Sequence, residues 1–82
     1  KPCECLTMQQ FNKMKELERI LRNTSVGDTV EVIYDGDIYH FTRCGKRFPT
    51  FTVMINGYIY ERKPIFQPKI ITSWLKEGTF KE

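Results

Sequence analysis

The chain has little of the residue chemistry from which most active sites are built. It contains one histidine, His40, and no Ser-His-Asp arrangement, no glycine-rich phosphate loop and no helical metal motif. Its carboxylates form no obvious pair for general acid–base catalysis, because Asp35 belongs to a turn while Asp28 and Asp37 stand at the starts of strands. These absences predict that the chain is not an enzyme and uses no cofactor.

Long apolar runs are also lacking. No stretch approaches the roughly 20 apolar residues that a membrane-spanning helix needs, and the opening Lys1-Pro2-Cys3-Glu4-Cys5 lacks the apolar part of a secretory signal. We therefore predict a soluble, cytoplasmic chain with no membrane partner. The apolar fraction of 40% and the charged fraction of 28% are near globular averages, and 82 residues predict one domain over 1–82.

Cysteines are few and odd in number, which excludes a closed disulfide framework. Two alternatives stay open: a zinc site formed by Cys3, Cys5, His40 and Cys44, and one disulfide from Cys3 or Cys5 to Cys44. In a predicted strand, His40 and Cys44 would lie roughly 13 Å apart. That is too far for two ligands whose bonds to one metal are about 2.0–2.3 Å long. We therefore predict three reduced thiols and no metal.

A first helix is predicted over about residues 7–23. Thr7 followed by Gln10 matches a capping box, and Leu6 with Phe11 matches a hydrophobic staple. Apolar residues then recur at spacings of three and four, which indicates one buried helix face. They are Phe11, Met14, Leu17, Ile20 and Leu21.

Two β-hairpins are predicted from the dipeptides Asp35-Gly36 and Asn56-Gly57, because both accept the positive φ angles of a type I′ turn. The flanking segments are rich in β-branched and aromatic residues, as strands prefer. The four predicted strands cover residues 29–34, 37–43, 50–55 and 58–62. Joined by the connection 44–49, they form an antiparallel meander.

The segment after the second hairpin predicts a short helix over residues 68–77. Pro68 suits the first helical turn, and Gly78 suits the residue after the last one. The predicted fold class is therefore α+β: an N-terminal helix packed on a four-stranded antiparallel meander of two hairpins, followed by a short C-terminal helix.

Two-residue turns fix the register of the strands and so assign their faces. The residues predicted to face the core beneath the first helix are Val30, Val32, Tyr39, Phe41, Phe51, Val53, Ile55, Tyr58 and Tyr60. On the other, solvated face the predicted cross-strand pairs are Thr29–Thr42, Glu31–His40 and Thr52–Glu61. A Glu–His pair of this kind is an ordinary surface feature of a sheet.

Positive charge is concentrated in the second half of the chain. Residues 1–40 carry five Lys and Arg against seven Asp and Glu, whereas residues 41–82 carry eight against three. In the meander, the connection 44–49 and the end of the fourth strand lie at the sheet end opposite the turns. Five cations are predicted to meet there with one aromatic ring: Arg43, Lys46, Arg47, Arg62 and Lys63, with Phe48 beside them.

This basic rim predicts a small binding module that contacts nucleic acid, DNA or RNA, mainly at phosphates, with Phe48 stacking on a base. A regulatory, DNA-binding role would fit such a module. The alternative explanation is structural, because cations at sheet ends and edges also deter aggregation between strands.

A second candidate site lies near the hairpin tips. Ile33 opposes Ile38 and Met54 opposes Ile59 on the face predicted to be solvated. Either the C-terminal segment folds across these four side chains, which we favour, or a partner protein covers them. The second case predicts a protein-interaction or inhibitor module that binds a protein partner or forms a dimer.

Overall fold

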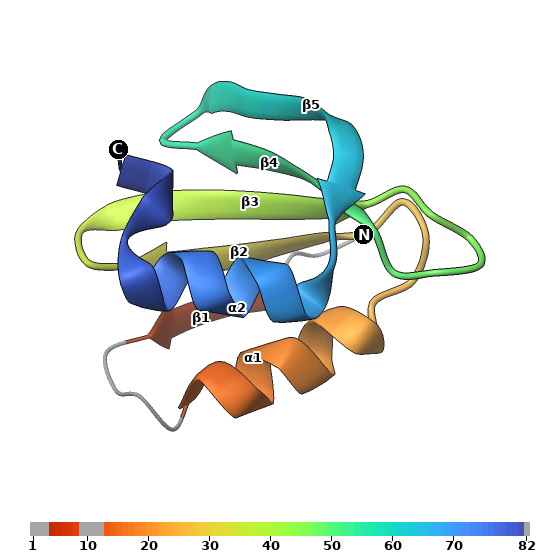
Figure 1. The fold of residues 1–82 in the computed structure, drawn as a ribbon, viewed down its shortest axis with the longest axis horizontal. Helices are drawn as coiled ribbons and strands as arrows, with labels where there is room; N and C mark the ends of the chain where they lie inside the picture. Colours follow the sequence, from red (N-terminus) through yellow and green to blue (C-terminus); the bar gives the residue numbers. More distant parts are fainter. Residues whose placement is uncertain (1–3, 9–12, 82) are drawn as a thin grey trace.

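The structure, a computed structural model, describes residues 4–8 and 13–81, with the backbone alone for 4–8 and 13. In chain order its elements are β1 (Glu4–Met8), α1 (Lys13–Arg22), β2 (Thr29–Tyr34), β3 (Asp37–Arg43), β4 (Phe51–Ile55), β5 (Tyr58–Phe66), α2 (Pro68–Glu77) and the 3-10 helix η1 (Thr79–Lys81). Figure 1 shows both α-helices on one side of a single sheet.

The sheet has five strands in the order β1-β2-β3-β4-β5. Strands β2 to β5 form the predicted antiparallel meander, and β1 adds to its outer edge in parallel with β2. Helix α1 connects these two parallel strands, as a parallel pair requires. The α+β class, with one helix before the four-stranded meander and one after it, is confirmed.

The predicted start of the first helix is wrong. Thr7 and Leu6 lie in strand β1, so neither the capping box nor the staple forms, while Gln10 and Phe11 lie outside the described residues. The described part of α1 runs from Lys13 to Arg22. Pairing with β1 satisfies backbone groups along the edge of β2. This stabilisation by strand pairing outweighs the local preference for a helix start that the spacing of Thr7 and Gln10 indicated.

The first hairpin has the predicted register throughout. Val30 pairs with Phe41, and Val32 pairs with Tyr39. Both turns have the positive φ angles that the dipeptides predicted: 52° at Asp35 and Asn56, and 83° and 85° at the glycines that follow. A two-residue turn leaves no freedom in the pairing beside it, which is why this part could be assigned from sequence.

The second hairpin departs from its predicted register. Met54 pairs with Ile59 as expected, but Glu61 lies opposite Val53 rather than Thr52. Strand β5 also continues to Phe66, which pairs with Phe51. Four residues of β5, 62–65, therefore bulge opposite the single residue Thr52. Pro64 lies in this bulge on an edge strand, where its missing N–H costs no ladder bond.

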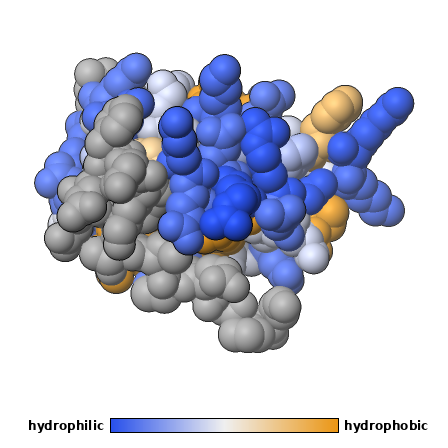
Figure 2. Space-filling view, turned by 90° about the horizontal axis from the view of Figure 1, so that it is seen from below, coloured by the Kyte–Doolittle hydropathy of each residue, from blue (hydrophilic) through white to orange (hydrophobic). Residues whose placement is uncertain are grey.

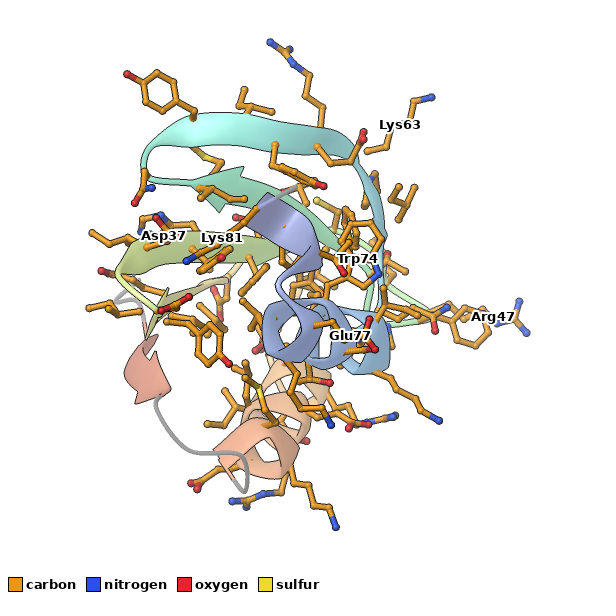
Figure 3. All side chains as sticks on the ribbon, turned by 60° about the vertical axis from the view of Figure 1, so that its left-hand side comes forward. Asp37, Arg47, Lys63, Trp74, Glu77 and Lys81 are labelled. Carbon is orange, nitrogen blue, oxygen red and sulfur yellow. The ribbon has the colours of Figure 1, made fainter. Side chains whose placement is uncertain are left out.

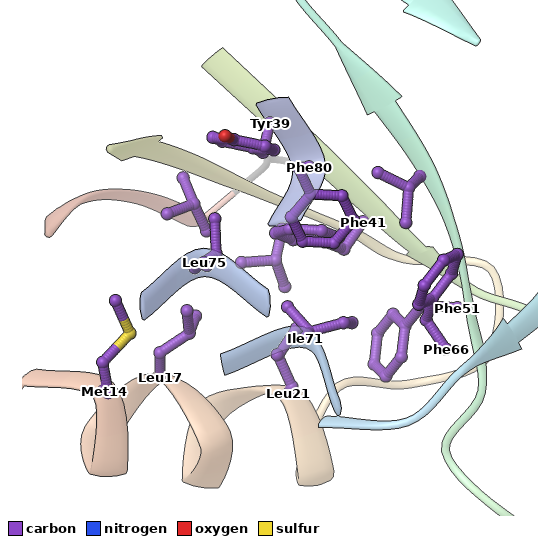
Figure 4. Packing of buried hydrophobic residues seen from close by; sticks show 13 residues of the cluster. Met14, Leu17, Leu21, Tyr39, Phe41, Phe51, Phe66, Ile71, Leu75 and Phe80 are labelled. Carbon is purple, nitrogen blue, oxygen red and sulfur yellow. The ribbon is translucent and has the colours of Figure 1, made fainter. Parts of the chain in front are cut away.

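The core lies between the sheet and the two helices and forms one cluster (Figure 4). Its buried residues are Met14, Leu17, Leu21, Val30, Val32, Tyr39, Phe41, Phe51, Val53, Phe66, Ile71, Leu75 and Phe80. Burial raises the pKa of the Tyr39 hydroxyl. Ile55 is partly buried and packs against this cluster, and the Tyr60 ring contacts Phe66 and Phe80, so both lie on the predicted core face. Tyr60 is nevertheless 40% exposed, and Tyr58, 79% exposed, is not buried as a core residue would be. Tyr58 adjoins the turn at the tip of the sheet, where little packs on it.

Helix α2 matches its predicted bounds, residues 68–77. Pro68 opens it, and Gly78 closes it in the left-handed conformation with φ 75°. After this cap, η1 places the Phe80 ring among five others, with centroids 5.1–6.3 Å apart. They are Tyr39, Phe41, Tyr60, Phe66 and Trp74. In the described part of the chain, no helix is long and apolar enough to cross a membrane.

Candidate nucleic-acid interface

The connection between β3 and β4, residues 44–50, forms a tightly closed loop. The backbone N–H groups of Cys44 and Gly45 both donate to the Thr50 carbonyl, at 2.9 and 3.4 Å. A Cβ atom on residue 45 would collide with the Phe48 carbonyl oxygen and the Thr50 hydroxyl. Glycine is therefore required at this position for close approach of the two sides of the loop.

Arg43 braces this loop from within. Its guanidinium donates to three carbonyl oxygens, those of Gly45 (2.9 Å), Lys46 (3.2 Å) and Thr24 (2.7 Å). Three of its five N–H donors are thus used inside the fold. Of the six residues predicted at the basic rim, Arg43 is consequently the one that the structure ties most closely to its own chain.

The tip of the loop carries Lys46, Arg47 and Phe48, which we call the loop group. All three are exposed, and 64% of the Phe48 surface is accessible. The Arg47 Cζ atom lies 5.9 Å from the centroid of the Phe48 ring, within cation–π range. Figure 3 shows Arg47 projecting away from the rest of the molecule.

The bulge of β5 carries Arg62 and Lys63, which we call the bend group. Both side chains are exposed. The neighbouring carboxylate, Glu61, accepts a hydrogen bond of 3.0 Å from the backbone N–H of Lys63. Among the side chains that the structure describes, those of residues 14–81, no carboxylate lies within ion-pair distance of any cation of the loop group or the bend group.

Both groups lie at the same end of the sheet. The pairing of Phe51 with Phe66 brings the end of β5 beside the start of β4, where the 44–50 loop arrives. Figures 1 and 3 show the bend of β5 and this loop at that end, although Arg47 and Lys63 project in different directions. The predicted basic rim is therefore divided into two groups rather than drawn together at one point.

At the opposite end of the sheet, the Lys81 ammonium is bound by other residues of the chain. The Lys81 ammonium lies 2.7 Å from an Asp35 carboxylate oxygen and 3.2 Å from one of Asp37, and the Asn56 side-chain amide donates to Asp37 at 3.0 Å. The hydrogen bonds from Asn56 and then Lys81 lower the pKa of Asp37. The bonds to Asp35 and then Asp37 raise the pKa of Lys81.

The apolar hairpin-tip residues lie on the sheet face that carries no helix. Helix α2 packs beside α1 on the other face, so the prediction that the C-terminal segment covers this patch is wrong. The reason is that α2 places Ile71 and Leu75 in the common core. Ile38 and Ile59 are 39% and 53% exposed, whereas Ile33 and Met54 are partly buried.

The predicted Glu31–His40 pair lies on this open face, with the His40 Nε2 atom 3.8 Å from a Glu31 carboxylate oxygen. Cys44 is an exposed free thiol. Cys3 and the Cys5 side chain lie outside what the structure describes, so the zinc and disulfide alternatives that include them stay untested. Among the side chains that are described, no group of three or more His, Cys, Asp or Glu could hold a metal ion.

A groove of about 290 Å³ between α1 and α2 was not predicted from the sequence. It is lined by Met14, Lys15, Glu18, Lys69, Thr72, Ser73 and Lys76. Glu18 is already bound by Arg22 at 2.6 Å. Figure 2 shows that the side of the molecule on which α1 lies is largely hydrophilic. The lining comes from two helices some 50 residues apart in the chain, so no local pattern marks it.

Comparison with known proteins gives no match among family models, curated proteins or solved structures. Fold class alone does not imply a function. The features of this chain that bear on function are therefore the geometry and charge of the two cation groups.

Proposed function

We propose that this chain is a small nucleic-acid-binding module that contacts phosphates through the loop group and the bend group. The observation that carries the proposal is the set of exposed cations at one sheet end, Lys46, Arg47, Arg62 and Lys63, without a carboxylate partner in the described chain. Cations left unpaired can replace the counterions of a nucleic-acid backbone, which makes binding favourable and dependent on salt.

The bracing of the 44–50 loop supports the same proposal. Arg43 and the two N–H bonds to the Thr50 carbonyl hold the loop in one shape before any ligand arrives. A preformed loop spends little conformational entropy on binding. Lys46 and Arg47 are thereby presented together at a fixed place on the surface.

The test is fluorescence anisotropy with labelled single- and double-stranded DNA and RNA at two ionic strengths. Affinity should fall as salt rises, and the double variant Lys46→Glu, Arg47→Glu should bind at least about tenfold more weakly. The matched control is Lys15→Glu, Lys69→Glu, which makes the same change in net charge on the helical side. The proposal is wrong if the loop variant binds as well as the parent, or if the control loses as much affinity.

The open sheet face favours a second candidate function, self-association. Ile38 and Ile59 are exposed there, and none of the described helices covers them. Glu31 and His40 also lie on this face. In a two-fold dimer formed through it, Glu31 of each copy can pair with His40 of the other copy. Other protein partners would need the same apolar contacts.

Light scattering over a range of concentrations tests self-association. Ile38→Lys should shift a dimeric parent to monomer. Ile70→Lys is the matched control, because Ile70 is 41% exposed but lies on α2. A parent that stays monomeric at the highest concentration, or a control that dissociates equally, rules this candidate out.

A further inference from the structure

Phe48 is the exposed aromatic ring that lies among the unpaired cations. Two other aromatic residues of the described chain are exposed. Tyr58 adjoins the Asn56-Gly57 turn at the other end of the sheet, and the Tyr60 ring packs against Phe80 at a centroid distance of 5.2 Å. A ligand held by the loop group therefore meets the Phe48 ring and neither tyrosine.

The Phe48 ring has the surroundings of a stacking platform. The Arg47 Cζ atom lies over the ring, 5.9 Å from its centroid, and 64% of the Phe48 surface is accessible. Pro49 follows, which restricts the Phe48 backbone to extended conformations. The loop that carries the ring is closed at Gly45 and braced by Arg43, so its backbone is tied to the end of β3.

We infer that the ligand is single-stranded nucleic acid and that one of its bases stacks on Phe48, an inference that rests on the proposed function above. A base inside a duplex has both faces covered by its neighbours, so an aromatic side chain reaches one only by unstacking a base step, which costs free energy. A single strand offers unstacked bases, which pack on aromatic rings regardless of their sequence. Lys46 and Arg47 would then contact the phosphates that flank the stacked base.

At the hairpin tips, the described residues of the open sheet face offer no second stacking surface, and the His40 imidazole farther along this face lies 3.8 Å from a Glu31 carboxylate oxygen. The apolar residues at the hairpin tips are aliphatic: Ile33, Ile38, Met54 and Ile59. A single-strand module that binds on its sheet stacks bases on aromatic rings there. In this chain the aromatic contact is offered by the loop, so the stacking contact and the phosphate contacts of Lys46 and Arg47 come from the same seven residues, 44–50, while the bend group adds phosphate contacts of its own.

The test compares Phe48→Ala and Phe48→Tyr with the parent on a labelled 12-nucleotide single strand and on the corresponding duplex. The parent should bind the single strand more tightly than the duplex. Phe48→Ala should weaken single-strand binding by roughly 5- to 150-fold, as loss of one stacked base does, and Phe48→Tyr should restore it. The salt dependence of Phe48→Ala should equal that of the parent, because no charge is removed.

The outcomes separate this inference from the proposal beneath it. Suppose that Phe48→Ala binds the single strand as tightly as the parent, whereas the double variant Lys46→Glu, Arg47→Glu binds it more weakly. The inference of base stacking is then wrong, and the proposal of phosphate contact is supported. If the parent prefers the duplex, the single-strand assignment is wrong. Should the parent bind neither probe even at low salt, both fail. The emission of Trp74, the single tryptophan, verifies that each variant is folded.

Discussion

The two ends of the sheet treat positive charge in opposite ways. At the hairpin-tip end, the Lys81 ammonium is bound by two carboxylates and a backbone carbonyl. At the other end, the loop group and the bend group carry four exposed cations, none of which forms an ion pair with a carboxylate among the described side chains. The first arrangement ties the C-terminal segment to the first hairpin, whereas the second leaves charge available to a ligand.

The two ends of the sheet also differ in how far their aromatic rings are exposed. Phe80, next to Lys81, is 5% exposed and contacts five rings, whereas Phe48, next to Arg47, is 64% exposed. Each end thus has an adjacent pair of one cation and one aromatic residue. One pair is used inside the fold, and the other is held on the surface by a braced loop.

The largest expected effect is on stability, from the same substitution made at each end. Phe80→Ala should lower the free energy of unfolding by about 3–5 kcal/mol, because a large ring leaves a cavity in the core. Phe48→Ala should change it by no more than about 0.5 kcal/mol, since little is buried there. Urea unfolding followed by Trp74 fluorescence measures both, and equal losses would erase the distinction between the two ends.

A smaller loss of stability is expected from Arg43→Met. This substitution keeps much of the aliphatic part of the side chain but removes the guanidinium. Three carbonyl groups lose a charged donor, which should cost about 1–3 kcal/mol of unfolding free energy. The amides of Cys44 and Gly45 should exchange with deuterium faster as the loop loosens. Arg47→Met is the control and should leave both measurements unchanged. If both variants behave alike, Arg43 does not brace the loop.

Substitution of one lysine at each end of the sheet should give a still smaller difference in thermal stability. Lys81→Met should lower the thermal midpoint, because two carboxylates lose their shared partner. Lys46→Met should leave the midpoint unchanged or raise it slightly, since Arg47 beside it then meets less like charge. Differential scanning calorimetry at low salt gives both values. A loss at Lys46 as large as that at Lys81 would mean that the loop cations serve the fold.

The smallest effect is a pH dependence at the hairpin-tip end. The pKa of Asp37 is lowered in the fold, so the stabilisation from its bonds is fully present above its ordinary pKa of 3.8 and is lost as pH falls through the folded value. Asp37→Asn should therefore be less stable than the parent at pH 7, with the difference shrinking below pH 3.8. Thermal unfolding from pH 7 to pH 2 measures this difference, with Glu16→Gln as a surface control. A difference that stays constant down to pH 2 would contradict the shift.

The sequence anticipated the parts of the fold that depend on neighbours in the chain. Asp35-Gly36 and Asn56-Gly57 determined two turns, and the first turn determined the whole register of its hairpin. Pro68 and Gly78 marked the ends of α2 correctly. The sequence failed at Thr7, whose capping pattern was local while its pairing partner in β2 lies 26 residues away, at Ile33.

The candidate site was anticipated in composition but not in detail. Charge counting found the loop group and the bend group, because a meander must bring its connection and its last strand to one sheet end. It could not show that Arg43 is occupied by three carbonyls, because those oxygens belong to the backbone and carry no residue signature. Nor could it foresee the bulge at residues 62–65 that separates the two groups.

By itself, the sequence determined the strands beside the two turns, the type of both turns, the bounds of α2 and the concentration of cations in the second half of the chain, because these depend on residue type and short-range geometry. Only the tertiary structure decided which cations are paired, which ring is exposed and which sheet face stays uncovered. Those outcomes depend on where α2, η1 and β1 pack, and packing is set by contacts between residues far apart in the chain.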